Sequence, residues 1–288
     1  MNKKFRKIIA ATLALTFTLS LAGCGGQKQE QQAQQAQQGE AESSVLKVGM
    51  ECGYAPFNWT QLDDSNGAVP IQGDSTFANG YDVQIAKKVA ESMGKELVIV
   101  RTEWDGLVPA VQSGVLDMII AGMSPTEKRK ESIDFSDNYY TSDLVIVVRS
   151  DSDLVNATSI QDFAGKKITA QLNTFHDTVI DQIEGVQHHT AMTDFPAMRV
   201  ALQSGVIDGY VSERPEGISA SMANSDFTYV AFEADKGFKY ELNDVAIAAG
   251  LKKGSPLVEG VNAALANISE EERQQLMNDA IANQPAAE

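Results

Sequence analysis

Two side chains of opposite charge follow two similar phrases of the sequence. Residues 112–117 read QSGVLD and residues 203–208 read QSGVID, with Arg129 downstream of the first copy and Glu213 downstream of the second. The planar guanidinium of arginine can hold a carboxylate through two hydrogen bonds, and a carboxylate can pair with an ammonium. If the two copies face each other, Arg129 and Glu213 together suit a zwitterion. Taken alone, Arg129 could instead be one solvated charge in the run TEKRKE, and Glu213 an ion-pair partner of Arg214 or a surface residue.

Further polar and aromatic residues stand where predicted strands end, and open α/β sheets bind ligands just beyond the carboxyl ends of their strands. These residues are Glu51, Tyr54, Gly122, Ser124 and Thr174. Gly122 would let a ligand approach the backbone closely. Residues 171–174 precede a predicted helix, whose free N–H groups could bind an anion. Simple capping of that helix by Asn173 or Thr174 explains the same residues.

The apolar pattern alternates between short runs and amphipathic stretches along most of the chain. Short runs predict strands at 46–50, 97–100, 115–121, 144–148, 167–170, 206–211 and 245–249. Helical spacing predicts helices at 81–93, 104–113, 174–183, 196–204, 256–268 and 270–282. Such alternation indicates an α/β fold with a largely parallel sheet. Each repeated phrase would be a helix end, a glycine stop and the start of a buried strand, so we interpret it as scaffold and expect no ligand contact from Asp117 or Asp208.

The first 23 residues have the features of a bacterial lipoprotein signal peptide. A basic start precedes a charge-free apolar run at 8–21, which is too short to remain as a membrane-spanning helix. The sequence Leu21-Ala22-Gly23-Cys24 resembles a lipobox, which implies cleavage before Cys24 and attachment of a lipid to its thiol. The alternative is an ordinary signal peptide with an incidental cysteine. Residues 24–44 carry no large apolar side chain and are predicted to be a disordered tether.

Composition excludes several other classes of function. The net charge of −16 argues against a nucleic acid partner. With Cys24 lipidated, Cys52 has no partner for an internal disulfide. No phosphate-binding glycine loop, Cys–His pair or GxSxG elbow occurs, and His188-His189 would point in different directions. We therefore expect no cofactor, no metal and no enzymatic activity.

Several motifs together resemble the extracytoplasmic solute-binding proteins (family 3 type) of ABC importers for polar amino acids. The motifs are YAPF at 54–57, GYDVQIA at 80–86, the stretch 104–113, GMSPTEKR at 122–129 and DFSDNYY at 134–140. The chain departs from the family pattern at Gln84, where a second acid is usual, and at Leu172-Asn173-Thr174, where G-T-T is common. It also has Glu213 where the family usually has an aspartate.

The resemblance implies a type II, two-lobe periplasmic-binding fold, each lobe a mixed, mostly parallel sheet flanked by helices. Lobe 1 would comprise residues 45–140 and 234–288, lobe 2 residues 141–233, with hinges near 139–144 and 232–236. Arg129 would clamp the ligand carboxylate, helped by the N–H groups of Ser124 and Thr174. The ligand ammonium would bind to the Gly122 carbonyl, the Ser124 hydroxyl and Glu213. The ligand side chain would contact the remaining predicted residues, Tyr54, Trp104 and Glu51.

The implied function is that of a monomeric receptor, lipid-anchored on the outer face of the cell membrane. It would capture a free amino acid by hinge closure and deliver it to an ABC permease. Two aromatic residues and an acid favour arginine or lysine as the ligand. Glutamine or another neutral polar amino acid is the alternative, and a ligand-sensing module or a dehydratase could use the same fold.

Overall fold

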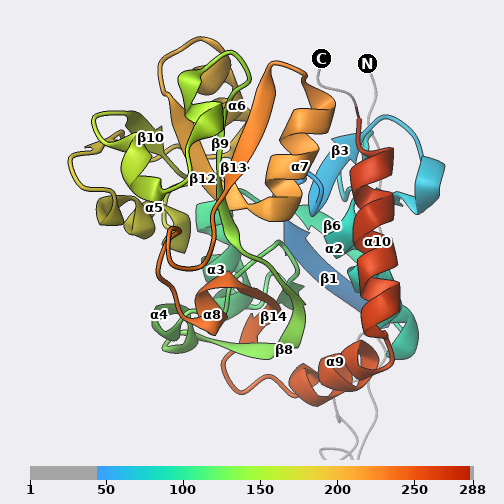
Figure 1. The fold of residues 1–288 in the computed structure, drawn as a ribbon. Coiled ribbons are helices and arrows are strands. Elements are labelled where there is room, and N and C mark those ends of the chain that lie inside the picture. The colour runs from blue at the N-terminus through green and yellow to red at the C-terminus, as the bar shows by residue number, and fades with distance from the viewer. Residues whose placement is uncertain (1–43, 286–288) are drawn as a thin grey trace, which may run out of the picture. The chain divides into compact units, whose positions relative to one another are not determined.

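The computed structural model describes residues 44–285 of the chain. The predicted signal peptide, Cys24 and the predicted tether apart from Ser44 lie outside these residues. Within the described part, no helix is both long enough and apolar enough to cross a membrane. Residues 44–285 belong to one compact unit, which is shown in Figure 1.

The first of two five-stranded sheets has the strand order β6-β1-β7-β14-β8. Its strands are β1 (Val45–Met50), β6 (Glu96–Arg101), β7 (Met118–Ile119), β8 (Ile133–Thr141) and β14 (Ala246–Lys252). β1 pairs in parallel with β6 and β7, whereas β14 pairs antiparallel with β7 and β8.

The second sheet has the order β11-β10-β12-β9-β13 and the same mixture of directions. Its strands are β9 (Leu144–Arg149), β10 (Lys167–Thr169), β11 (Gln187–His188), β12 (Gly209–Glu213) and β13 (Phe227–Ala231). β10 pairs in parallel with β11 and β12, and β9 pairs antiparallel with β12 and β13. The fold is thus α/β with two mixed sheets. The antiparallel share is larger than the strand–helix alternation predicts, because each sheet receives one strand directly from the other sheet. These strands, β9 and β14, run antiparallel to both of their neighbours.

A smaller sheet, absent from the sequence-based prediction, has the order β2-β3-β5-β4. Its strands are β2 (Gly53–Tyr54), β3 (Asn58–Gln61), β4 (Val69–Pro70) and β5 (Phe77–Asn79). These strands are too short to give a periodic apolar signal. Their pairing places Tyr54 at the end of β2.

Helices flank the two large sheets (Figure 1). They are α2 (Tyr81–Ser92), α3 (Trp104–Ser113), α4 (Glu127–Lys130), α5 (Phe175–Val179), α6 (Phe195–Gln203), α7 (Arg214–Ala223), α8 (Leu242–Val245), α9 (Leu257–Ala266) and α10 (Glu270–Asn283). Short 3₁₀ turns occupy η1 (Ser65–Gly67), η2 (Asp153–Asn156), η3 (Ile160–Phe163) and η4 (Ile180–Gln182). The predicted helix 174–183 is therefore α5 followed by η4.

The second sheet is buried on both faces, as its alternating side chains show. Val147 belongs to a hydrophobic cluster that runs from the first sheet to Phe195, whereas Ile146 and Val148 belong to a second cluster around Phe163. Because successive side chains of a strand point to opposite faces, β9 contributes to both cores. The unbroken apolar run of β9 is the sequence signal of this double burial.

Each repeated phrase forms the same turn between a helix and a strand. Gly114 and Gly205 adopt left-handed φ values of 81° and 74° just after α3 and α6. The amides of Val115 and Val206 then donate to helix carbonyls, those of Ala110 and Ala201. The predicted strands 115–121 and 206–211 consequently begin later than expected, at Met118 and Gly209, because these valines still belong to the helix-capping turn.

The two aspartates of the phrases hold the start of a neighbouring strand. Asp117 Oδ2 accepts from the Lys47 amide at 2.7 Å, and Asp208 Oδ2 accepts from the Lys167 amide at 2.8 Å. The aspartate amides in turn donate to the carbonyls of Lys47 and Lys167. Asp117 and Asp208 are therefore scaffold, as the sequence interpretation states.

We expect Asp117→Ala and Asp208→Ala each to lower the free energy of unfolding by about 1–2 kcal/mol, because each removes a charge-assisted bond to a backbone amide. Urea denaturation would measure this loss. Asp117→Asn and Asp208→Asn keep an acceptor oxygen and should lose less. Equal losses for the alanine and asparagine variants would contradict the assignment.

Candidate ligand-binding site

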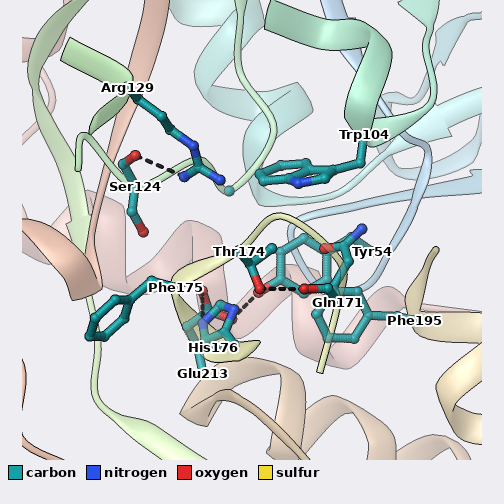
Figure 2. A pocket seen from close by; sticks show the side chains of 11 residues that line it. Tyr54, Trp104, Ser124, Arg129, Gln171, Thr174, Phe175, His176, Phe195 and Glu213 are labelled. Atoms are coloured by element: carbon teal, nitrogen blue, oxygen red, sulfur yellow. Dashed lines mark hydrogen bonds and ion pairs between the residues drawn. The ribbon is translucent and has the colours of Figure 1, made fainter. Parts of the chain in front are cut away.

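A small polar pocket lies where elements of the first and second sheets meet (Figure 2). Its wall consists of Tyr54, Trp104, Gly122, Ser124, Arg129, Gln171, Thr174, Phe175, His176, Phe195 and Glu213. The cavity volume is about 10 Å³, which is room for about one water. All of the sequence-predicted contact residues except Glu51 line this pocket.

Arg129 is supplied by the four-residue helix α4, which follows the end of β7. The Thr126 side chain caps α4 by accepting from the Arg129 amide at 3.4 Å. The guanidinium donates to the Ser124 carbonyl at 3.0 Å and to the Asn173 carbonyl at 3.1 Å. Within residues 44–285 no carboxylate forms an ion pair with Arg129. This partly buried guanidinium is held by two neutral carbonyls, which do not compensate its positive charge.

Trp104, the first residue of α3, packs against this guanidinium. The Arg129 Cζ atom lies 5.0 Å from the centre of the indole ring, as Figure 2 shows, which is within range of a cation–π contact. Burial lowers the pKa of Arg129 to about 10, although Glu213 acts in the opposite direction. The guanidinium therefore stays charged at neutral pH while it is partly removed from water.

Glu213 supplies the negative charge from the last position of β12, directly before α7. It is 1% exposed. Its Oε2 atom accepts a short hydrogen bond from the Tyr54 hydroxyl, and its Oε1 atom lies 3.0 Å from His176 Nε2. Burial acts to raise the pKa of Glu213, but His176 and Tyr54 outweigh it and hold that pKa below its ordinary value. Glu213 is an ionised carboxylate in an almost water-free site.

Tyr54 reaches Glu213 because Gly122 leaves space for its ring. Gly122 has a φ of 62°, and a Cβ atom there would lie 2.6 Å from Tyr54 Cε1. On its other side the Tyr54 ring stacks on Phe195, with centroids 4.1 Å apart and planes inclined by 11°. Residues of the small sheet, of the loop after β7 and of α6 are thereby packed around one phenol.

The buried carboxylate of Asp82 connects two segments that lie next to the pocket. It accepts from Asn58 Nδ2 at 2.9 Å and from the Tyr139 hydroxyl at 2.7 Å. Burial raises the pKa of Asp82 to about 6, while Tyr139, Asn58 and the backbone of Gly122 act to lower it through hydrogen bonds. Asp82 comes from the GYDV motif, and its role is to position the backbone of the pocket.

Thr174 lines the pocket at the start of α5, but its hydroxyl is already bonded. The Thr174 Oγ1 atom donates to the Gln171 carbonyl at 2.6 Å and makes no cap for α5. The preceding residue, Asn173, has a φ of 58° and donates from Nδ2 to Asp105 at 2.8 Å. Asparagine tolerates this left-handed conformation better than most residues do.

Glu51 lies beside the pocket and contacts one of its lining residues. Its Oε1 atom accepts from Gln171 Nε2 at 2.8 Å, whereas its buried Oε2 atom has no hydrogen-bond partner in the described part of the chain. Burial raises the pKa of Glu51 to about 8, against the Gln171 hydrogen bond, which acts to lower it. Glu51 is therefore protonated at neutral pH in this conformation.

Four lining residues escaped sequence-based prediction: Gln171, Phe175, His176 and Phe195. Gln171 directly follows the predicted strand 167–170, and this place at a strand end is a signal that could have identified it as a lining residue. Phe175 and His176 look like ordinary residues of an amphipathic helix, and Phe195 like a core residue at a helix start. Nothing in their spacing indicates that they face a site formed by another part of the chain.

Comparison with known proteins gives a consistent result. The family model for bacterial extracellular solute-binding proteins, family 3, matches residues 46–281. A Campylobacter jejuni protein named "Probable histidine-binding protein" is 33% identical over 63% of this chain and 64% of its own length. The arginine-binding extracellular protein ArtP of Bacillus subtilis is 28% identical over 60% of this chain and 58% of its own length. The matched stretch therefore covers less than two thirds of either relative.

Among solved structures, an amino acid ABC transporter substrate-binding protein from Streptococcus pneumoniae, bound to L-arginine, has the same fold. It is 25% identical with a TM-score of 0.72, and the match covers 83% of this chain and 94% of that one. The two mixed sheets described above are thus those of a type II periplasmic-binding fold.

The packing of Tyr54 on Gly122 can be tested with two alanine substitutions. Gly122→Ala and Gly114→Ala both place a side chain at a left-handed φ, but a Cβ at Gly114 meets nothing within 4 Å. We expect Gly122→Ala to cost about 1–3 kcal/mol more than Gly114→Ala, because of the added overpacking against Tyr54. Denaturant unfolding would measure the difference. Equal costs would mean that Tyr54 does not depend on Gly122.

Proposed function

Because the chain belongs to the bacterial extracellular solute-binding proteins of family 3, we propose that it captures a polar L-amino acid and delivers it to an ABC permease. Members of this family are extracytoplasmic binding proteins and not enzymes, so the pocket serves capture and release rather than turnover. The names of the relatives, which refer to histidine and arginine, support an amino acid as the ligand.

The observation that carries the proposal is the pair of opposite buried charges in one small pocket. Among the described residues, Arg129 has two carbonyl partners and no carboxylate partner, whereas the Glu213 carboxylate contacts the Tyr54 hydroxyl and the His176 ring. The α-carboxylate of an amino acid would complete the first group through a bidentate contact. Its α-ammonium would pair with the second. A zwitterion satisfies both charges at once, which neither a simple cation nor a simple anion does.

Binding requires the pocket to open, because a cavity of about 10 Å³ is too small for any amino acid. The chain passes from the first sheet to the second between Thr141 and Leu144, and returns between Ala231 and Ala246. We propose that these connections act as hinges between lobe 1 (45–140 and 234–288) and lobe 2 (141–233). Contacts such as Glu51–Gln171 and Asp105–Asn173 would break on opening, and the ligand would then favour the closed form.

A cationic side chain, with arginine preferred over lysine, is the ligand that we propose. The buried Glu51 Oε2 atom lacks a partner, and a guanidinium beside it would supply two donors and a compensating charge. The aromatic faces of Tyr54 and Trp104 would add cation–π contacts. The L-arginine bound to the Streptococcus pneumoniae protein supports this choice.

A neutral polar amino acid such as glutamine is the second candidate. It is favoured by the raised pKa of Glu51 and by the Gln171 amide that already contacts it. A protonated Glu51 can donate to a neutral amide without any need for a positive partner. A ligand-sensing role for the same pocket would leave the binding residues unchanged and would differ only in the partner protein.

We further propose that a lipid on Cys24 anchors the protein, as a monomer, to the outer face of the cell membrane. The residues directly before Cys24 carry the support for this proposal. Treatment with a signal peptidase II inhibitor should then leave an uncleaved precursor, and Cys24→Ala should release the protein from membranes.

Arg129→Ala should weaken binding of every amino acid ligand by about 100-fold or more, because it leaves the ligand carboxylate buried without a cation. Arg129→Lys should lose less, since it keeps the charge without the planar fork. Titration calorimetry against the twenty amino acids would measure both, with Arg149→Ala, a partly buried arginine outside the pocket, as the control. Binding of none of the twenty, or full affinity in Arg129→Ala, would overturn the proposal.

The two ligand classes predict different pH profiles. The pKa of Glu51 is about 8 in the pocket, so below pH 8 a cationic ligand must first ionise this group. The ratio of arginine to glutamine affinity should then fall about tenfold per pH unit between pH 8 and pH 6. The other titrating groups of the pocket act on both ligands and cancel from the ratio. In Glu51→Gln the ratio should be low and independent of pH. A wild-type ratio that does not change with pH would favour the neutral ligand.

A further inference from the structure

His176 places an imidazole ring in the pocket wall with unusual hydrogen bonding. The residue is 7% exposed. Its Nε2 atom lies 3.0 Å from Glu213 Oε1, which is an ion-pair distance without the alignment of a hydrogen bond. Its Nδ1 atom has no partner in the part of the chain that the structure describes. Buried ring nitrogens normally find partners, so an unsatisfied pair in a ligand pocket indicates a role in binding.

The partner of His176 is the carboxylate that the proposed function assigns to the ligand ammonium. Among the described residues, His176 is the one basic side chain within ion-pair distance of Glu213. Burial by itself acts to raise the pKa of Glu213, and His176 is the largest influence in the opposite direction. Removing either partner would leave the other without its compensating charge in a site nearly free of water, which is costly.

We propose that His176 occupies, in the absence of ligand, the position at which the ligand α-ammonium would pair with Glu213. In the ligand-free protein its imidazolium is the counter-ion of Glu213, and an incoming α-ammonium displaces it and takes over that contact. The second half of this proposal rests on the proposed function, whereas the first half does not. His176 is thus a residue that determines specificity, because a ligand without a cationic group has nothing to offer Glu213 in exchange.

The surroundings of the ring are consistent with this exchange. The charged or titratable groups that share the pocket with His176 are Glu213 at the end of β12, Tyr54 at the end of β2 and Arg129 in α4. Tyr54 donates its hydroxyl hydrogen to the other oxygen of Glu213, so it stabilises the carboxylate without competing for Oε1. Arg129 directs its guanidinium to the Ser124 and Asn173 carbonyls. Among these groups, Glu213 is the one that lies within ion-pair distance of Nε2.

The other two histidines provide matched controls, since the chain contains three in all. His188 lies 2.8 Å from both Asp177 and Asp181 at the surface. His189 is partly buried, and its Nδ1 atom lies 3.2 Å from the Thr190 carbonyl. Neither belongs to the pocket, so neither should respond to a ligand.

The test is ¹⁵N nuclear magnetic resonance of the histidine side chains at pH 7. Single His→Gln substitutions at 176, 188 and 189 assign the three signals, and if His176→Gln does not fold, the other two variants assign it by elimination. In the ligand-free protein we expect the His176 signal to be that of an imidazolium, and to shift to the neutral form in Glu213→Gln. Saturation with L-arginine should shift the wild-type signal to the neutral form, while His188 and His189 stay unchanged.

A neutral His176 in the ligand-free wild-type protein would overturn the proposal, and no ligand is needed to see it. An imidazolium that persists unchanged under saturating L-arginine, with binding confirmed by calorimetry, would overturn the displacement step. If calorimetry detects no binding of any of the twenty amino acids, the proposed function fails instead. The ligand-free spectrum then still decides whether His176 is the counter-ion of Glu213.

Discussion

A carboxylate removed from water must find compensating charge within its own pocket, and this constraint on Glu213 organises the site. Tyr54 and His176 supply that compensation from two different segments, and Arg129 contributes to it from farther away. The Tyr54 ring in turn needs the bare backbone of Gly122 and the face of Phe195. Packing and electrostatics are thus coupled, because the phenol that bonds the carboxylate also fills the space between the two sheets.

The scaffold that carries these groups uses one local design twice. In each copy a helix ends in a serine and a left-handed glycine, and an aspartate then accepts from a backbone amide near the start of the adjacent parallel strand. The copies diverge where their strands end: one leads to Gly122 and Arg129, the other to Glu213. Backbone geometry is conserved between the halves, while the side chains beyond it present opposite charges to the same cavity.

The pocket of about 10 Å³ holds residues that partner one another: Arg129 bonds carbonyls, Glu213 meets His176, and Glu51 meets Gln171. A ligand that contacts Glu213 or Gln171 must therefore replace an internal contact. Net affinity depends on the difference between these two sets of interactions rather than on the number of ligand contacts. Glu51 and His176 should have the largest effect on this difference, because the contacts that a ligand would change at these two residues involve a charge and not a neutral hydrogen bond.

Periodicity and strand–helix alternation are local properties, so the amino-acid sequence predicts the α/β class, most long helices and strands, and the residue types at the strand ends. It did not predict the small sheet, whose strands are too short to show a period, or the late start of β7 and β12 after a capping turn. Pocket membership of Phe175, His176 and Phe195 was decided by tertiary structure alone. Tyr54 and Glu213 are 159 positions apart in the chain, and no local sequence pattern indicates that their side chains are in contact. Whether Glu213 is ionised, and whether Glu51 is protonated, likewise depends on burial and neighbours that exist only after the two sheets have come together.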